Sequence, residues 1–189
     1  MQIKLNQGFH GGSGGGNLNG WGNWWKKLND NGHSVNAIMA DTAGPLYEIQ
    51  NGSTLDNTLV YRISLVKDGF DPNTPNYLAD PEIESERMIL TKRNLHWPPE
   101  LDKYKVWLKD TNEIRTKIGD INDRFWNNLA PGEWWGRYAL HAAELTVERN
   151  ERIILLNPAS GDHELEFWDQ PSMVLFLEYA AAHRNNVLV

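Results

Sequence analysis

The sequence predicts an α/β fold, in which helices cover a parallel sheet. Short apolar runs typical of strands alternate along the chain with segments whose apolar residues recur at helical spacing. A helix between every two strands implies crossover connections, and these join parallel strands. The 189 residues contain no internal repeat and no dividing linker. We therefore expect one domain over residues 1–189, large enough for a sizeable core.

The first part of the chain predicts three strands and two helices. Ile3 to Phe9 alternate apolar and polar residues, which is typical of a strand. A tryptophan-rich stripe recurring at i, i+3, i+4 and i+7 then predicts a helix that packs on the sheet and ends near Asn31-Gly32. The stripe consists of Trp21, Trp24, Trp25 and Leu28. Strands are expected at 34–39 and 58–64, with a short helix at 45–50 between them.

The second part continues the alternation. Asp80-Pro81-Glu82 reads as an N-cap, a proline at the first helical position and an acidic first turn, so a helix should run from there to about Trp97. Val106, Trp107 and Leu108 predict a buried fourth strand. The remaining elements are moderate helix character at 118–128, a strong helix at 135–147, a strand at 152–156, a helix at 171–183 and the start of a sixth strand at 186–189.

Composition argues against several classes of function. The net charge of −7 speaks against nucleic-acid binding, which depends on clustered Lys and Arg. No apolar run approaches the ~20 residues that span a bilayer, and the first ten residues lack the apolar core of a signal peptide. We therefore expect no membrane partner. With 0 cysteines the chain has neither disulfides nor a thiol nucleophile, which leaves its compartment undecided.

A glycine-rich segment, GGSGGGN, follows the first predicted strand and invites comparison with phosphate-binding loops. The spacing does not fit, because no G-x-G-x-x-G register matches residues 8–20 and no Lys-Ser/Thr pair follows. We therefore expect neither a nucleotide nor any other cofactor.

The candidate active site is the segment 104–114, YKVWLKDTNEI, where the fourth strand runs into a polar cluster. In parallel α/β folds the carboxyl ends of the strands carry the chemistry. Asn112 beside Glu113 could hold a substrate hydroxyl while the carboxyl group reaches the bond to be broken. A solvated strand end is the structural alternative, since Asn-Glu is common at turns.

Several segments in order resemble the (β/α)₈-barrel glycoside hydrolases, the TIM-barrel type. They are GFHGG, AGPLYE, YRIS, VWLKDTNEI, WWGRYALHAAEL, ILLNPASGDHE and MVLFLEYAAAH, and they cover nearly the whole chain. In such enzymes an Asn-Glu pair at the end of strand four carries the general acid/base. The resemblance thus implies that Glu113 is the acid/base and that Asn112 binds a neighbouring sugar hydroxyl.

The sequence departs from that family at its end. The family's nucleophile comes from strand seven, whereas about six strands are predicted here. A full barrel needs about 250 residues, so we expect an incomplete barrel that forms the N-terminal three quarters of a longer one. Open parallel edges favour association, and closure by a second copy of the chain is the alternative.

Further polar residues near predicted strand ends are expected to contact sugar hydroxyls. They are His10, Asp41, Arg62, Asn157 and Ser160. Each has a structural alternative: His10 as a loop or core histidine, and Asn157 as a turn cap. Arg62 lies within an apolar run, and a buried Arg needs a carboxylate or ligand partner. Pairing with Glu113 would lower the pKa of that carboxyl group and oppose an acid role.

Two other functions compete with hydrolysis of a glycosidic bond, which itself could be retaining or inverting. A non-catalytic carbohydrate-binding barrel would keep the tryptophan surfaces without the chemistry. A metal-dependent hydrolase or isomerase could use His10, Asp41 and His163 as ligands. These three stand alone on separate loops without an H-x-H or H-E-x-x-H pair, so we expect no metal.

Overall fold

The computed structural model describes residues 8–12, 20–40, 42–50, 53, 55–63, 75–109, 127–156 and 165–189, with 8–12 and Leu95 in backbone only. The chain forms two compact units. Unit 1 comprises residues 1–64 and 97–109, and unit 2 comprises residues 65–96 and 110–189.

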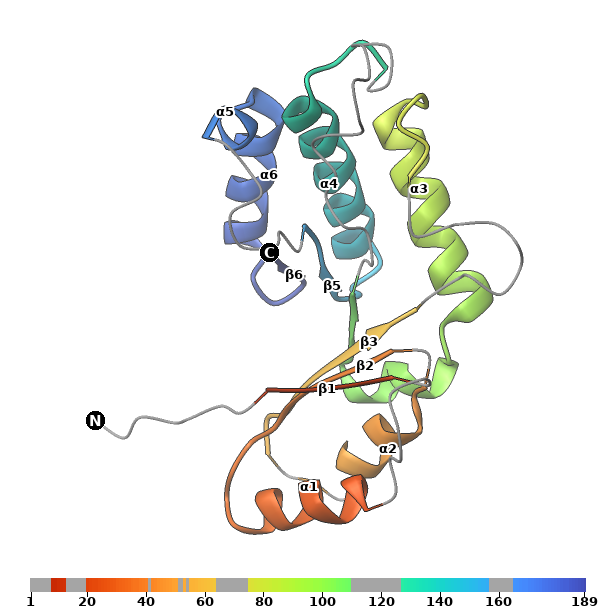
Figure 1. Cartoon of the computed structure of the whole chain (residues 1–189), viewed down its shortest axis with the longest axis vertical. Coiled ribbons are helices and arrows are strands. Elements are labelled where there is room, and N and C mark those ends of the chain that lie inside the picture. The colour runs from red at the N-terminus through yellow and green to blue at the C-terminus, as the bar shows by residue number, and fades with distance from the viewer. Residues whose placement is uncertain are drawn as a thin grey trace. The chain divides into compact units, whose positions relative to one another are not determined.

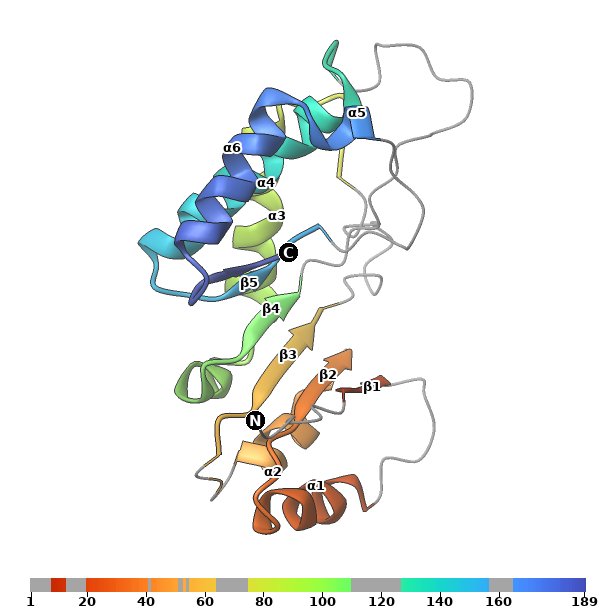
Figure 2. The same cartoon turned by 90° about the vertical axis from the view of Figure 1, so that its left-hand side faces the viewer.

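Unit 1 is built on four parallel strands. They are β1 (Gly8–Gly12), β2 (Asn36–Ala40), β3 (Thr58–Arg62) and β4 (Trp107–Lys109). Each strand pairs in parallel with the next, β1 with β2, β2 with β3 and β3 with β4. Figure 2 shows β2, β3 and β4 running side by side in the same direction. All their carboxyl ends therefore lie at one edge of this sheet.

The two faces of this sheet differ in burial because side chains alternate along each strand. One face is fully covered, and its residues are Ala37, Met39, Leu59, Tyr61 and Leu108, all 7% exposed or less. The other face includes Val60 and Trp107, which are buried, and Ile38, Arg62 and Lys109, which are half-buried. The charged side chains of the strands thus lie on the less covered face.

Two helices of unit 1 lie together on one side of β1 to β3 (Figure 1). They are α1 (Trp21–Asp30) and α2 (Gly44–Gln50), and a 3₁₀ helix, η3 (Pro99–Tyr104), precedes β4. The predicted tryptophan stripe is confirmed in part. Trp25 is fully buried and contacts the Trp21 ring edge-on at 5.2 Å, whereas Trp24 is 42% exposed.

A hydrogen-bonded network closes the amino-terminal end of β2 and β3. Asn57 Oδ1 accepts from the backbone N–H of Val35 at 2.9 Å and from Asn29 Nδ2 at 3.2 Å. Asn57 Nδ2 donates to Asn29 Oδ1 at 3.1 Å and to Ser53 Oγ at 3.1 Å. Val35 and Asn57 directly precede the two strands, so this network fixes where both strands begin.

Unit 2 is mostly helical. Its helices are α3 (Pro81–Thr91), the π-helix η2 (Lys92–His96), α4 (Pro131–Glu148), α5 (Leu165–Trp168) and α6 (Pro171–Ala182). Its strands, β5 (Ile153–Ile154) and β6 (Val187–Leu188), pair in parallel. As predicted, the Asp80 side chain caps α3 by accepting from the N–H groups of Glu82 and Ile83 at 3.0 and 3.3 Å.

Aromatic rings and small residues pack the helices of unit 2. Trp134 of α4 stacks on Tyr138 with ring centroids 5.4 Å apart, and both are fully buried. Gly136 allows α4 to approach α6, because a Cβ at this position would collide with backbone atoms of Ser172 and Met173. Glu133 then accepts from Ser172 N and Oγ at 3.0 and 2.6 Å, which caps the start of α6.

The described strands and helices confirm a mixed α/β fold with parallel strands. One predicted boundary was wrong: the first strand was expected at residues 3–9, and β1 extends to Gly12, while residues 3–7 lie outside the part of the chain that the structure describes. His10, expected beyond the strand, is therefore inside it. Glycine has low strand propensity, and pairing with β2 overrides that local preference. The described pairings do not include the ring closure of a barrel, and the single domain stays a prediction.

Candidate functional site

The carboxyl ends of β1 to β4 form one row across the sheet of unit 1. In the register of the strands, Gly12 lies beside Ala40, Ala40 beside Arg62, and Arg62 beside Lys109. Two residues earlier, His10 lies in register with Ile38, and Val60 with Trp107. The sheet therefore ends on a pair of cationic residues, with an apolar row directly beneath them.

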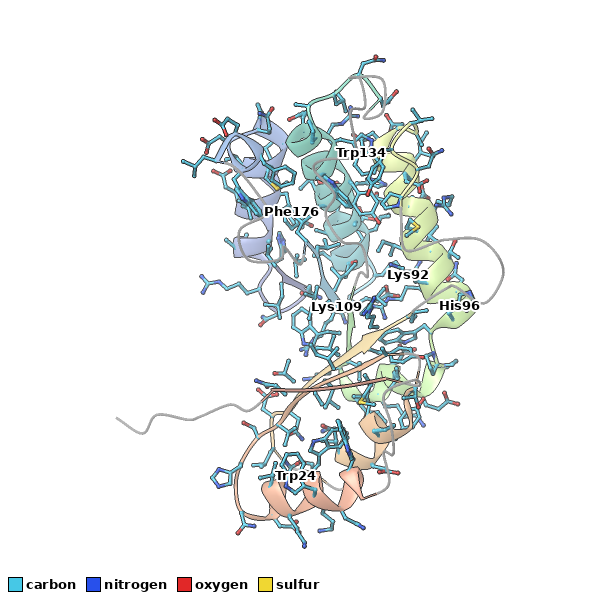
Figure 3. All side chains as sticks on the ribbon, viewed as in Figure 1. Trp24, Lys92, His96, Lys109, Trp134 and Phe176 are labelled. Carbon is cyan, nitrogen blue, oxygen red and sulfur yellow. The ribbon has the colours of Figure 1, made fainter. Side chains whose placement is uncertain are left out.

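Arg62 and Lys109 are the last residues of β3 and β4 and face the same side of the sheet, because they are directly opposite each other in parallel strands. Neighbouring strands lie about 4.8 Å apart. Both side chains are half-buried. Burial, and then the neighbouring Arg62 guanidinium, lowers the pKa of the Lys109 ammonium group. Figure 3 labels Lys109 at the end of β4.

The prediction for Arg62 needs correction in one respect. It was expected to be buried within the apolar strand, and it is half-buried at the strand's last position. Its Nε atom is nevertheless buried and has no hydrogen-bond acceptor among the residues that the structure describes. Glu113, the carboxylate considered above as its partner, lies outside the described residues, as does Asp41.

Most other predicted site residues also lie outside the part of the chain that the structure describes. They are Asn112, Asn157 and Ser160. For His10 the structure gives the backbone register alone, at the third position of β1. The structure therefore brings together the side chains of Arg62 and Lys109 on the neighbouring strands β3 and β4, and it places the backbone of His10 on β1 of the same sheet.

Sequence reasoning missed Lys109. The signal that could have found it is position, because Lys109 ends an apolar strand directly before the Asp110-Thr111-Asn112-Glu113 cluster, just as Arg62 ends TLVY. A polar residue that ends a buried parallel strand points to the edge where sites form.

Two buried charges of unit 2, Glu84 and Arg93, are of a different kind, because both are paired. Glu84 is 3% exposed, accepts from Asn76 N at 2.8 Å and forms an ion pair with Arg87. Arg93 donates to the carbonyl oxygen of Arg152 at 2.6 Å and lies 3.2 Å from Glu151 Oε2. These groups stabilise the packing of unit 2, and we do not assign them to the site.

Two further observations concern the described residues. They contain no group of three or more His, Asp or Glu residues arranged to hold a metal ion. None of their helices combines the length and apolar character required for crossing a bilayer. His163, the third ligand of the metal-site alternative, lies outside these residues together with Asp41.

Comparison of the chain with family models, curated proteins and solved structures returned no match.

Proposed function

We propose that this chain forms part of a (β/α) barrel of the TIM type that binds and cleaves a carbohydrate at the carboxyl ends of its strands. The observation that carries the proposal is the in-register parallel pairing of β1 to β4. Chemistry in parallel α/β folds is built at that edge. Asn112 and Glu113 follow β4 by three and four residues in the sequence.

In this proposal Glu113 is the general acid/base and protonates the leaving oxygen of the glycosidic bond. The second carboxylate, the nucleophile or base, is not assigned to any residue of this chain. A separation of about 5–5.5 Å between the two carboxyl groups makes the enzyme retaining, and about 6.5–9.5 Å makes it inverting. Asn112 holds a sugar hydroxyl, and His10, Asp41, Arg62, Asn157 and Ser160 supply further polar contacts.

The test replaces Glu113 with Gln in the protein as its gene encodes it and measures hydrolysis of a panel of glycosides. We expect kcat/KM to fall by about 10²–10⁴-fold, the usual contribution of a positioned acid/base. The matched control is Glu86→Gln, because Glu86 is an exposed carboxylate on α3. Unchanged hydrolysis by the Glu113 variant would overturn the assignment.

Calorimetry on the same oligosaccharides separates hydrolysis from the non-catalytic alternative. A wild-type protein that binds sugars without cleaving any of them is a carbohydrate-binding barrel. A wild-type protein that neither binds nor cleaves a sugar contradicts the proposal in both forms.

A further inference from the structure

Two cationic residues, Arg62 and Lys109, lie directly opposite each other at the ends of β3 and β4. Like charges directly opposite each other on neighbouring strands are destabilising. Arg62 and Lys109 occupy such positions and are both half-buried, where water screens their charges less than at an exposed site. An anion beside the pair would offset this repulsion.

No carboxylate among the described residues forms an ion pair with either Arg62 or Lys109. The pKa of Lys109 is lowered by burial and then by Arg62, in agreement with a nearby positive charge and no compensating negative one in the described part of unit 1. The Arg62 Nε–H group is buried without an acceptor there.

The two side chains complement each other as an anion site. The guanidinium of Arg62 presents several N–H donors in one plane, which matches the two oxygens of a carboxylate or the oxygens of a phosphate. The ammonium of Lys109 adds a compact charge with three donors. Val60 and Trp107, buried in the row beneath on the same face, provide an apolar floor, and a low-dielectric floor strengthens a charge-assisted hydrogen bond.

We infer that Arg62 and Lys109 together bind an anionic group, a carboxylate or a phosphate, carried by the sugar substrate. The inference rests on the proposed function, because it assigns a substrate class to the same edge of the sheet. It gives Arg62 a specific role in place of general contact with sugar hydroxyls. The site then favours an acidic sugar over its neutral counterpart, since a neutral sugar leaves both cations without a partner.

The experiment measures binding of the full chain to immobilised oligosaccharides prepared as matched triplets. The members of a triplet share one backbone and carry a neutral sugar, its uronic acid or its 6-phosphate. We expect wild-type protein to bind one acidic member at least tenfold more tightly than the neutral member. The member that is preferred decides between carboxylate and phosphate.

Four variants locate the effect. Arg62→Met and Lys109→Met keep most of the aliphatic stem and remove the charge, and each should reduce the acidic preference to threefold or less. Lys109→Arg keeps the charge and should retain the preference. Lys103→Met is the control, because Lys103 is an exposed lysine of η3 in the same unit, and the preference should be unchanged.

The outcomes separate this inference from the proposed function. Binding of neutral and acidic members with equal affinity overturns the inference and leaves the proposed function standing. Absence of binding to every sugar overturns both. A melting temperature that falls in Lys109→Met and Arg62→Met while the acidic preference persists shows that a carboxylate of the chain itself is the partner, which also overturns the inference.

Discussion

The two ends of the sheet in unit 1 differ in whether their polar side chains have partners among the described residues. At the amino-terminal end, the Asn57 side chain bonds Val35, Asn29 and Ser53 within one closed network. At the carboxyl-terminal end, Arg62 and Lys109 bring only donors, and the described residues supply no carboxylate to them. Satisfied polar groups stabilise a fold, whereas donors held together without acceptors are suited to binding. We therefore assign a stabilising role to the amino-terminal end and propose a binding role for the carboxyl-terminal end.

The largest effect is expected from truncating a side chain in the buried apolar face of the sheet, which lies between its two ends. Leu108 is fully buried on the covered face of the sheet. Leu108→Ala should lower the free energy of unfolding by about 2–5 kcal/mol, because it removes buried methyl groups and leaves a cavity. Urea denaturation measures the loss. Leu175→Ala on α6 is the control, since that side chain is 53% exposed and its truncation should cost less than about 1 kcal/mol. Similar losses in the two variants would contradict a shared core beneath the two ends.

Asn57→Ala tests the amino-terminal end directly. It leaves the N–H group of Val35, a residue that is 1% exposed, without its acceptor. The free energy of unfolding should fall by about 1–3 kcal/mol, the cost of an unsatisfied buried donor. Denaturation in urea again provides the measurement, with the exposed Asn23 of α1 as the site of the control substitution Asn23→Ala. If sugar binding fell while stability did not, the roles of the two ends would be reversed.

Ser53→Ala should have a smaller effect at the same end. Ser53 Oγ accepts from Asn57 Nδ2 at 3.1 Å and from Leu55 N at 3.2 Å, but the bond from Val35 to Asn57 persists without it. We expect a loss of about 1 kcal/mol. In a double-mutant cycle with Asn57→Ala the losses should be non-additive, because the residues share one network. Strict additivity would mean that the two side chains act independently.

Much of the fold of the described residues could be predicted from local patterns. Capping residues placed the start of α3, because that signal is local and strong. The end expected near Trp97 is that of the π-helix η2, and α4 begins four residues before the predicted position 135. The end of the first strand was predicted too early, because Gly11 and Gly12 have low strand propensity and are held in the strand by pairing with β2. The exposure of Trp24 was missed for a related reason: helical spacing shows which residues share a stripe, and it does not show how far the covering layer extends.

The candidate site could be predicted only as an edge of a sheet. Strand order and polar strand ends pointed to the carboxyl ends of the parallel strands, and Arg62 lies there. The pairing of Arg62 with Lys109 could not be read from the sequence, because the two residues are far apart in the chain and meet only through the register of β3 and β4. Glu113 and Asn112 lie outside the described residues, so their role stays a prediction.

The smallest effect concerns the pH dependence of the carboxyl-terminal end. Burial and Arg62 lower the pKa of Lys109 in the folded protein. Between that lowered pKa and the unfolded value of about 10.4, the unfolded chain binds more protons at Lys109 than the folded chain does. The contribution of Lys109 to the free energy of unfolding therefore rises with pH in this window.

The quantity to compare is the free energy of unfolding of the wild type minus that of Lys109→Met. It should increase across this pH window, by less than about 1 kcal/mol because the group is partly exposed. Urea denaturation at a series of pH values measures the difference. A difference that decreases with pH would mean that a negative charge already accompanies Lys109 in the folded chain, and the two ends of the sheet would then be alike.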